Sequence, residues 1–180
     1  MQKSRTRKII LKKRDFFKTK NKKINFYKLL KLLNKKIKDK KIGLYYPIGS
    51  EVSTIELIEK LRKKKYIISL PVIKNNFKMS FYEWTKNSSL KINNFGIPEP
   101  IKKKKIIPST LIIPIVAFDI NLNRLGYGGG FYDRFINKIE KKKKLLKIGL
   151  ALSCQKINKV QINKFDKKMN YIFTENKVYK

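Results

Sequence analysis

A cluster of glycines constrains this chain more than any other feature of its sequence. Four of the eight glycines lie within five residues, and they are Gly126, Gly128, Gly129 and Gly130. An apolar segment (110–118) precedes them and an amphipathic segment (131–139) follows. Glycine permits positive φ, so consecutive N–H groups can converge on an anion, and the next helix adds its N-terminal dipole. The pattern predicts an anion-binding loop between a strand and a helix.

The loop matches neither of the two common phosphate-binding fingerprints. One requires Lys and Ser/Thr after the last glycine, where Phe131 and Tyr132 stand, and the other requires glycine in place of Phe131. A plain glycine turn is the alternative, but the charged neighbours Arg124, Asp133 and Arg134 favour a ligand site. Asp133 is a candidate Mg²⁺ ligand beside bound phosphates, and a surface carboxylate paired with a Lys is its alternative.

Strand-like and helix-like segments alternate along most of the chain. Short apolar runs predict strands at 42–47, 66–70, 79–84, 110–118, 147–152 and 171–174. Helical spacing predicts helices at 55–64 and 131–139, and two more within the first forty residues, separated near 21–25. We expect one α/β domain spanning residues 1–180, with a Rossmann-like, largely parallel sheet, helices on both faces and an N-terminal helical arm.

Local signals predict where these elements begin and end. Pro71 is expected to stop the strand at 66–70, and Pro114 to mark a bulge or an edge position. Ser53 and Glu56 have the spacing of a capping box at the start of a helix. The segment 94–107, which includes a run of four Lys, reads as a loop.

Composition excludes several kinds of catalytic site. The chain has no His and one Cys, so a Ser-His-Asp triad, a Cys-His pair, a His-ligated zinc site and an internal disulfide are impossible. It carries 46 Lys and Arg against 12 Asp and Glu, a formal net charge of +34. The basic residues are spread along the whole chain and include only six Arg. Either a nucleic-acid surface or compositional drift toward Lys, Ile and Asn on solvated faces accounts for this pattern.

Topology signals in the sequence are mostly negative. No apolar run approaches the roughly 18–20 residues that span a membrane, and no signal-peptide core follows the basic N-terminus. A single free Cys fits a reducing compartment. We expect a cytoplasmic protein with no membrane partner, and we expect a monomer.

The stretch from Arg124 to Arg134, preceded by Phe118-Asp119, resembles the signature of the 5-formyltetrahydrofolate cyclo-ligase family. Further pieces occur in the order in which that family has them, and the resemblance covers nearly the entire chain. They include Lys3-x-x-x-Arg7, Tyr45-Tyr46-Pro47, Glu51-Val52, Leu70-Pro71, Gly96-Ile97-Pro98-Glu99-Pro100 and Asn163-x-x-Asp166.

The resemblance implies a reaction. Mg-ATP would drive conversion of 5-formyltetrahydrofolate to 5,10-methenyltetrahydrofolate, with release of ADP and phosphate, through a phosphorylated formyl group. Phosphoryl transfer depends on positioning and charge neutralisation, so a chain without His can perform it. Two alternatives remain open: a basic nucleic-acid-binding protein, and a family member that binds folate or nucleotide without turnover.

The resemblance also implies roles for residues on the nucleotide side. It makes Arg124 a catalytic residue that balances charge on the transferred phosphoryl group. It assigns ATP binding to Lys3, Arg7, Arg124, Leu125, Gly126, Tyr127, Gly128, Gly129, Gly130, Phe131 and Tyr132. It makes Asp133 and Asp166 the magnesium ligands, although Met169-Asn170 stands where the family often has an Asp, which leaves the C-terminal register open.

On the substrate side, the resemblance assigns folate binding to Tyr46, Glu51, Tyr127, Gly128, Gly129, Gly130 and Phe131. A carboxylate such as that of Glu51 can accept two adjacent pterin N–H groups, and a charge at a helix N-terminus is its alternative role. Met79, Phe81 and Trp84 fit either apolar pocket walls or core, and Cys154 fits a small buried core position. Folates with or without a polyglutamate tail are anionic, so the positive charge favours their encounter.

Overall fold

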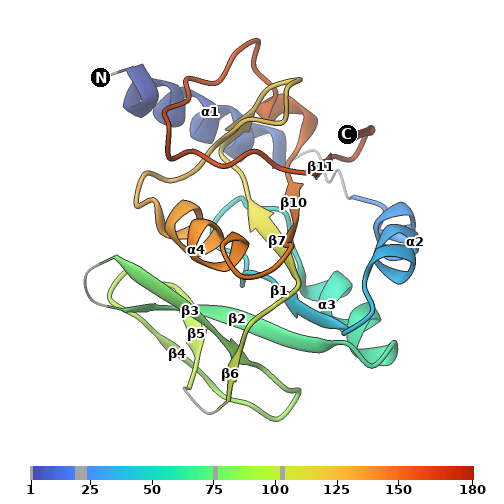
Figure 1. Cartoon of the computed structure of the whole chain (residues 1–180). Helices are drawn as coiled ribbons and strands as arrows, with labels where there is room; N and C mark the ends of the chain where they lie inside the picture. Colours follow the sequence, from blue (N-terminus) through green and yellow to red (C-terminus); the bar gives the residue numbers. More distant parts are fainter. Residues whose placement is uncertain (1, 19–23, 75–76, 102–103) are drawn as a thin grey trace.

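A twisted sheet forms the centre of the molecule (Figure 1). The structure is a computed structural model that describes residues 2–18, 24–74, 77–101 and 104–180. Within these residues the main sheet has eight strands, in the order β12-β11-β10-β7-β1-β2-β3-β6. Their bounds are β1 Lys41–Gly43, β2 Ile67–Lys74, β3 Lys78–Glu83, β6 Lys105–Ile106, β7 Thr110–Pro114, β10 Leu146–Leu150, β11 Tyr171–Phe173 and β12 Val178–Tyr179.

The middle of the sheet is parallel and its edges are antiparallel. Strand β1 pairs in parallel with β2 and β7, and β10 pairs in parallel with β7 and β11. The outer strands β12, β3 and β6 are joined in antiparallel register. This arrangement confirms the predicted α/β fold with a largely parallel sheet.

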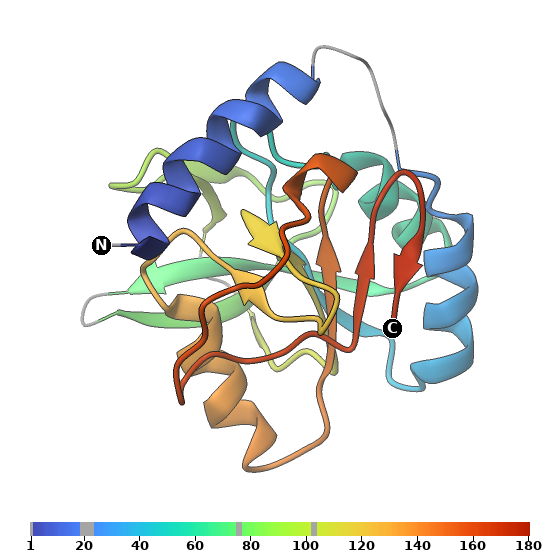
Figure 2. The same cartoon turned by 90° about the horizontal axis from the view of Figure 1, so that it is seen from above.

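Helices cover both faces of the sheet, as predicted. Alternate side chains of β7 point to opposite faces: Ile112 packs with α2 (Tyr27–Lys36) and α3 (Ile55–Lys63), whereas Leu111 and Ile113 pack with α4 (Phe131–Glu140). Figure 2 shows α2 and α4 at opposite sides of the strands. The two layers give the domain two apolar cores on either side of one sheet.

Helix α1 (Gln2–Lys18) lies beyond the carboxyl ends of the central strands. Its Ile10 is buried against Val116, Ala117 and Leu125, which follow β7 in the chain. It also packs on η1 (Ser153–Gln155), which follows β10. The predicted N-terminal arm is therefore packed onto the fold through α1 and α2. The predicted break near 21–25 falls largely on residues 19–23, outside the described residues.

Two predictions about prolines were wrong. Strand β2 continues through Pro71, which is opposite Phe81 of β3, to Lys74. Proline is tolerated there because the parallel neighbour β1 ends at the position opposite Ser69, so no β1 residue is paired with Pro71. The long strand predicted at 110–118 ends at Pro114, and residues 117–118 form β8 (Ala117–Phe118), which pairs with β9 (Arg124–Leu125) in a separate small sheet.

The capping box was also wrong. The N-cap of α3 is Thr54, and its hydroxyl donates to the carbonyl oxygen of Tyr45 at 2.7 Å instead of capping the helix. Ser53 is exposed, and Glu56 pairs with Lys60 at 2.6 Å. The hydroxyl of Thr54 thus ties the helix start to the segment after β1.

The segment 94–107 is not only loop. It contains β5 (Pro98–Pro100), which pairs with β4 (Leu90–Ile92) in a second small hairpin, and β6 at the edge of the main sheet. Lys102 and Lys103 of the Lys run lie outside the described residues. No helix of the described part of the chain is long and apolar enough to cross a membrane.

Candidate active site

The carboxyl ends of the central parallel strands open into a pocket of about 830 Å³. Pro114 at the end of β7 and Ile48 and Glu51 after β1 contribute to its wall. Every residue predicted to bind nucleotide, folate or metal lines this one pocket: Lys3, Arg7, Tyr46, Glu51, Arg124, Leu125, Gly126, Tyr127, Gly128, Gly129, Gly130, Phe131, Tyr132, Asp133 and Asp166. The fold therefore brings together residues that are up to 163 positions apart in the chain.

The glycine loop connects β9 to α4. It thus leaves the small β8–β9 sheet, and not a strand of the main sheet as the sequence suggested. Gly128 has φ +109°, a conformation that side chains rarely adopt, and a Cβ there would lie 3.4 Å from the guanidinium carbon of Arg7. A Cβ on Gly126 would lie 2.9 Å from a guanidinium nitrogen of Arg124. Glycines at these two positions allow two cationic side chains to lie directly against the loop.

Helix α1 holds the glycine loop from outside. The Nε of Arg7 donates to the carbonyl oxygen of Gly126 at 2.7 Å, and the ammonium group of Lys3, one turn earlier, forms an ion pair with Asp166 at 2.6 Å. The spacing of four residues places both cations on one helical face, as predicted. This face of α1 closes one side of the pocket.

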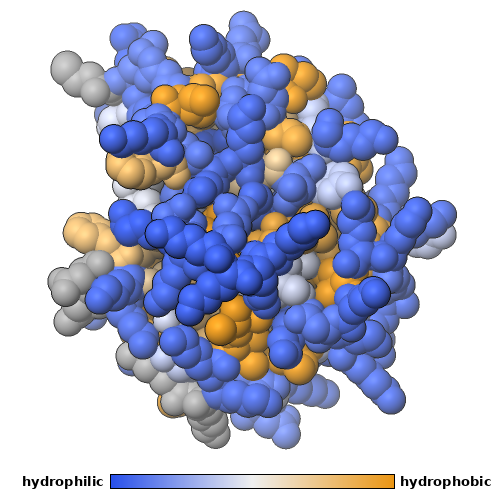
Figure 3. All heavy atoms as spheres, viewed as in Figure 1, coloured by the Kyte–Doolittle hydropathy of each residue, from blue (hydrophilic) through white to orange (hydrophobic). Residues whose placement is uncertain are grey.

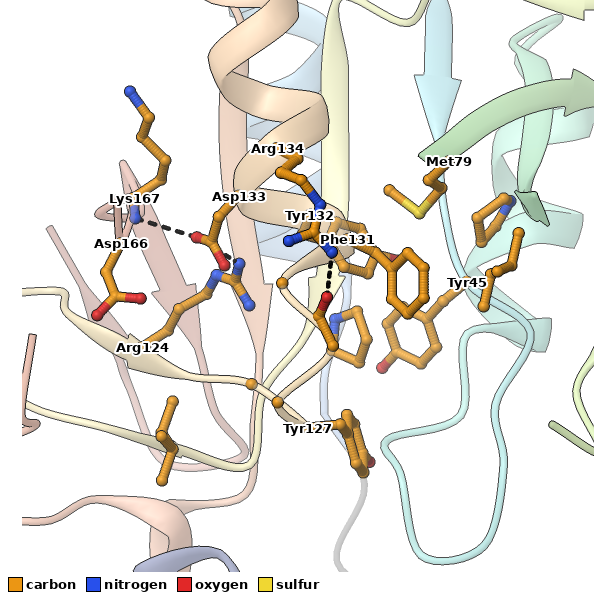
Figure 4. A pocket seen from close by; sticks show the side chains of 18 of the residues that line it. Tyr45, Met79, Arg124, Tyr127, Phe131, Tyr132, Asp133, Arg134, Asp166 and Lys167 are labelled. Atoms are coloured by element: carbon orange, nitrogen blue, oxygen red, sulfur yellow. Dashed lines mark hydrogen bonds and ion pairs between the residues drawn. The ribbon is translucent and has the colours of Figure 1, made fainter. Parts of the chain in front are cut away.

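Arg124 and Asp133 form the most buried charged pair of the pocket. They are joined at 2.8 Å, with the side chains 5% and 20% exposed, and the N–H of Lys167 also donates to Asp133 at 3.1 Å (Figure 4). The Nε of Arg124 is buried and has no hydrogen-bond partner among the described residues. A buried guanidinium with an unused donor favours an anionic ligand at this position.

The two aspartates fit a magnesium site that depends on phosphate ligands. Asp133 uses Oδ1 for its protein contacts, and Asp166 uses Oδ2, which accepts from Lys3 and from the N–H of Asn163. This leaves one oxygen of each carboxylate for a cation. The described residues contain no cluster of three or more His, Cys, Asp or Glu that could hold a metal. Mg²⁺ prefers one or two carboxylates together with phosphate oxygens and water, so this donor set fits it.

Glu51 lies on another wall of the pocket and is 7% exposed. Its Oε1 accepts from the hydroxyl of Tyr127 at 2.6 Å, and its Oε2 accepts from the N–H of Ile48 at 3.0 Å. Burial raises the pKa of Glu51, and these hydrogen bonds and the nearby Arg14 oppose that rise. Glu51 precedes the N-cap of α3 by three residues and contacts other groups, so it is a pocket carboxylate and not a helix-capping charge.

Sequence reasoning missed Arg14. Its side chain is 4% exposed, and its Nη1 donates to the hydroxyl of Tyr127 at 3.0 Å. Lys3, Arg7, Ile10 and Arg14 are spaced by four, three and four residues, so one face of α1 carries all of them. That spacing was readable in the sequence. The abundance of Lys on every face of the helix obscured it.

Apolar groups line the part of the pocket away from the ion pairs. Figure 4 shows Met79 and Tyr45 on one side of the glycine loop, and Arg124, Asp133 and Asp166 on the other. Phe95, on the β4–β5 hairpin, also lines the pocket and lies 6.2 Å from the ring of Phe131. The sequence gave no signal for Phe95 beyond its place in a glycine- and proline-rich segment.

Of the three apolar residues for which pocket wall and core were both open, one lines the pocket and two do not. Met79 lines the pocket, but Phe81 is fully buried and packs on Phe135 of α4 at 5.0 Å between ring centroids. Trp84 lies behind the wall residue Tyr46, with the rings 6.1 Å apart. Cys154 is buried, as expected for a core residue.

The positive charge is not confined to the pocket. Figure 3 shows hydrophilic side chains spread over one whole face of the molecule, with small apolar areas between them. Basic residues occur along the whole chain, and exposed ones such as Lys12, Lys31 and Lys141 lie outside the pocket lining. The pocket is distinguished by cations paired with carboxylates next to an apolar half, an arrangement suited to a ligand with phosphate groups at one end and a flat ring at the other.

The chain is similar to known proteins over most of its length. A family model described as the 5-formyltetrahydrofolate cyclo-ligase family matches residues 1–175. The chain is 35% identical over 134 residues to 5-formyltetrahydrofolate cyclo-ligase of Haemophilus influenzae, which is 71% of each chain. Its structure is similar to that of 5,10-methenyltetrahydrofolate synthetase of Aquifex aeolicus, with a TM-score of 0.78, 30% identity and coverage of 99% and 92% of the two chains. It is also similar to the corresponding Mycoplasma pneumoniae enzyme, with a TM-score of 0.72, 25% identity and coverage of 96% and 98%.

Proposed function

The chain belongs to the 5-formyltetrahydrofolate cyclo-ligase family and is a ligase, and we propose that it closes the ring of 5-formyltetrahydrofolate at the expense of ATP. The products are 5,10-methenyltetrahydrofolate, ADP and phosphate. The observation that carries this proposal is the single pocket in which the glycine loop, three cations and two carboxylates adjoin a buried carboxylate with apolar walls.

ATP binds at the glycine loop in this proposal. Lys3, Arg7 and Arg124 exchange their present partners for phosphate oxygens, and the N-terminus of α4 adds its dipole. Asp133 and Asp166 hold Mg²⁺, which when bound neutralises charge on the phosphates. Phosphate binding would release Asp133 from Arg124 and Asp166 from Lys3, so each carboxylate loses its cationic partner and keeps only a backbone N–H donor.

The pterin ring binds in the other half of the pocket. Glu51 accepts hydrogen bonds from its N–H groups, and Tyr46, Tyr127 and Phe131 enclose it together with the apolar wall that includes Met79. This orientation directs the formyl group on N5 toward the glycine loop. The two substrates meet where Tyr127 to Phe131 border both.

The reaction proceeds in two chemical steps. The formyl oxygen attacks the γ-phosphorus and ADP leaves, so the formyl carbon becomes electrophilic and carries a phosphate leaving group. The N10 nitrogen then attacks this carbon, loses its proton, and phosphate departs as the C–O bond breaks. Arg124 stabilises the charge on the transferred phosphoryl group, and no protein nucleophile is needed.

A spectroscopic assay tests the proposal. Purified protein with 5-formyltetrahydrofolate, ATP and Mg²⁺ should produce the absorbance of the methenyl product, and omission of ATP should abolish it. Substrate binding without any product would identify the non-catalytic alternative. If the protein neither binds the substrate nor forms the product, and if it binds nucleic acid tightly with a strong salt dependence, the nucleic-acid alternative is favoured.

The remaining expectations belong to the same proposal. The protein acts as a single domain and as a monomer in the cytoplasm, on folates with or without polyglutamate tails. No specific nucleic acid or membrane takes part.

A further inference from the structure

A buried hydrogen-bond network connects helix α1 to the folate half of the pocket. Its centre is Arg14, which is 4% exposed and whose Nε donates to the hydroxyl of Ser50 at 2.9 Å. Its Nη1 donates to the hydroxyl of Tyr127 at 3.0 Å, and Tyr127 donates in turn to Glu51 at 2.6 Å. Ser50 is also bonded to Asp15. One guanidinium thereby joins the segment after β1 to the glycine loop.

Arg14 is the cation that this network connects to the buried carboxylate of Glu51. Glu51 is 7% exposed, and a charge at such a depth is unstable without a compensating partner. The side chains around it are phenolic: Tyr127 bonds to it, and Tyr45 and Tyr132 interact with its charge. Burial and the charge of Glu51 raise the pKa values of Tyr45, Tyr127 and Tyr132, so all three are neutral at pH 7. The compensating positive charge therefore comes from Arg14.

We propose that Arg14 is a positioning residue that holds Glu51 ionised and correctly oriented for the pterin, acting through the hydroxyl of Tyr127. This inference rests on the proposed function, because it assumes that Glu51 receives the pterin N–H groups. Arg14 does not line the pocket, so it acts without touching the substrate.

The same helix serves both substrates. Lys3 and Arg7 lie at the phosphate side of the pocket. Arg14 lies two turns after Arg7, about 10 Å further along α1. Arg7 and Arg14 contact consecutive residues of the glycine loop, at the carbonyl oxygen of Gly126 and the hydroxyl of Tyr127. Docking of α1 therefore fixes the loop and Glu51 at the same time.

Direct binding of 5-formyltetrahydrofolate, measured by calorimetry without nucleotide, tests the inference. Arg14→Met should weaken binding by about tenfold or more, which is the loss expected when a hydrogen bond to a charged group is broken. The KM for ATP should change much less. Lys12→Met removes one positive charge from an exposed position on the same helix and is the matched control, with unchanged binding.

The pH profile separates positioning from general loss of structure. Binding that needs ionised Glu51 weakens as pH falls through the pKa of that group. Arg14 lowers that pKa, so in Arg14→Met the weakening should begin at a higher pH than in the wild type. Arg14→Lys, which keeps the charge but not the two-armed donor, should return the profile toward the wild type.

Tyr127→Phe interrupts the same chain of hydrogen bonds at its middle member. It does not disturb the core, because Tyr127 is 45% exposed. It should weaken folate binding in the same way as Arg14→Met, and the double variant should be no weaker than the weaker single variant. Additive losses, or normal folate binding by folded Arg14→Met, would overturn the inference alone. A wild-type protein that binds no 5-formyltetrahydrofolate would instead overturn the proposed function, and this inference with it.

Discussion

At the scale of single residues, charged side chains of the pocket form ion pairs with one another. Two cations proposed to bind phosphate are each paired with a carboxylate proposed to bind metal: Lys3 with Asp166, and Arg124 with Asp133. Phosphates and Mg²⁺ together can replace both kinds of partner, whereas either one alone leaves a charge uncompensated. The arrangement favours binding of the nucleotide together with its metal.

Arg124 and Asp133 give the sharpest prediction at this scale. Arg124→Ala should reduce kcat by about 10²–10³, the range seen when a donor to a developing charge is removed. Asp133→Asn should also reduce kcat strongly, because it removes a carboxylate proposed to hold Mg²⁺. Circular dichroism should show that the fold persists, because neither side chain belongs to the two main apolar cores. Arg5→Ala, an exposed change on α1, is the control and should leave turnover unchanged.

Near-normal turnover in either the Arg124 or the Asp133 variant would show that the glycine loop is assigned to the wrong task. Steady-state rates with saturating ATP and folate distinguish this result from a simple loss of affinity.

Sequence identified most of the pocket at this scale but not all of it. Glu51 and Asp166 were identified through the family resemblance, and both line the pocket. Arg14 was missed because burial, not residue type, distinguishes it from the other basic residues. For Phe81 and Trp84 the sequence left pocket wall and core open, because alternation in a strand gives the face of a side chain but not its depth along that face.

At the scale of elements, sequence periodicity located the main helices and the parallel core. Helix α4 and strands β3 and β11 lie at or within one residue of their predicted bounds. The errors occurred where tertiary pairing outweighs local preference. Pro71 remains in a strand because the neighbouring strand β1 ends before reaching it. Strand β5 forms because it pairs with β4 in a hairpin, and β6 forms because it pairs with β3 of the main sheet.

Helix α1 carries the prediction at the scale of elements. Lys8→Pro should raise the KM for ATP several-fold, because proline disrupts a helix interior by about 3 kcal/mol and releases the turn that bears Lys3 and Arg7. The thermal midpoint should fall by at most about 6–12 °C, which is the shift that corresponds to about 3 kcal/mol in a domain of this size.

Lys8→Ala is the matched control, since it removes the same exposed charge and keeps the helix. The proposed role of α1 is wrong if the proline variant has the same KM for ATP as this control.

At the scale of the whole molecule, the sequence predicted the architecture well because the glycine loop and the strand–helix alternation agree with each other. The sequence said less about the function of the net positive charge. A total of +34 does not say which of 46 basic residues meet a ligand. The family resemblance singled out Lys3, Arg7 and Arg124, and the fold brings all three to one pocket.

The distant Lys cluster tests whether the overall charge matters. Lys141, Lys142 and Lys144 are exposed after α4 and lie outside the pocket lining. Replacing all three with Gln should change kcat/KM by less than about twofold at physiological ionic strength, where charges beyond about 8 Å are screened. Lys3→Gln, which removes a single charge at the pocket, should have the larger effect. The reverse order would make the surface field, and not the pocket cations, the source of anion binding.

The most direct test of the central claim is the ratio of ADP to methenyl product in one reaction mixture. A pocket that couples phosphoryl transfer to ring closure predicts one ADP for each 5,10-methenyltetrahydrofolate formed. Methenyl product without ADP, or ADP formed at the same rate whether or not 5-formyltetrahydrofolate is present, would contradict the account.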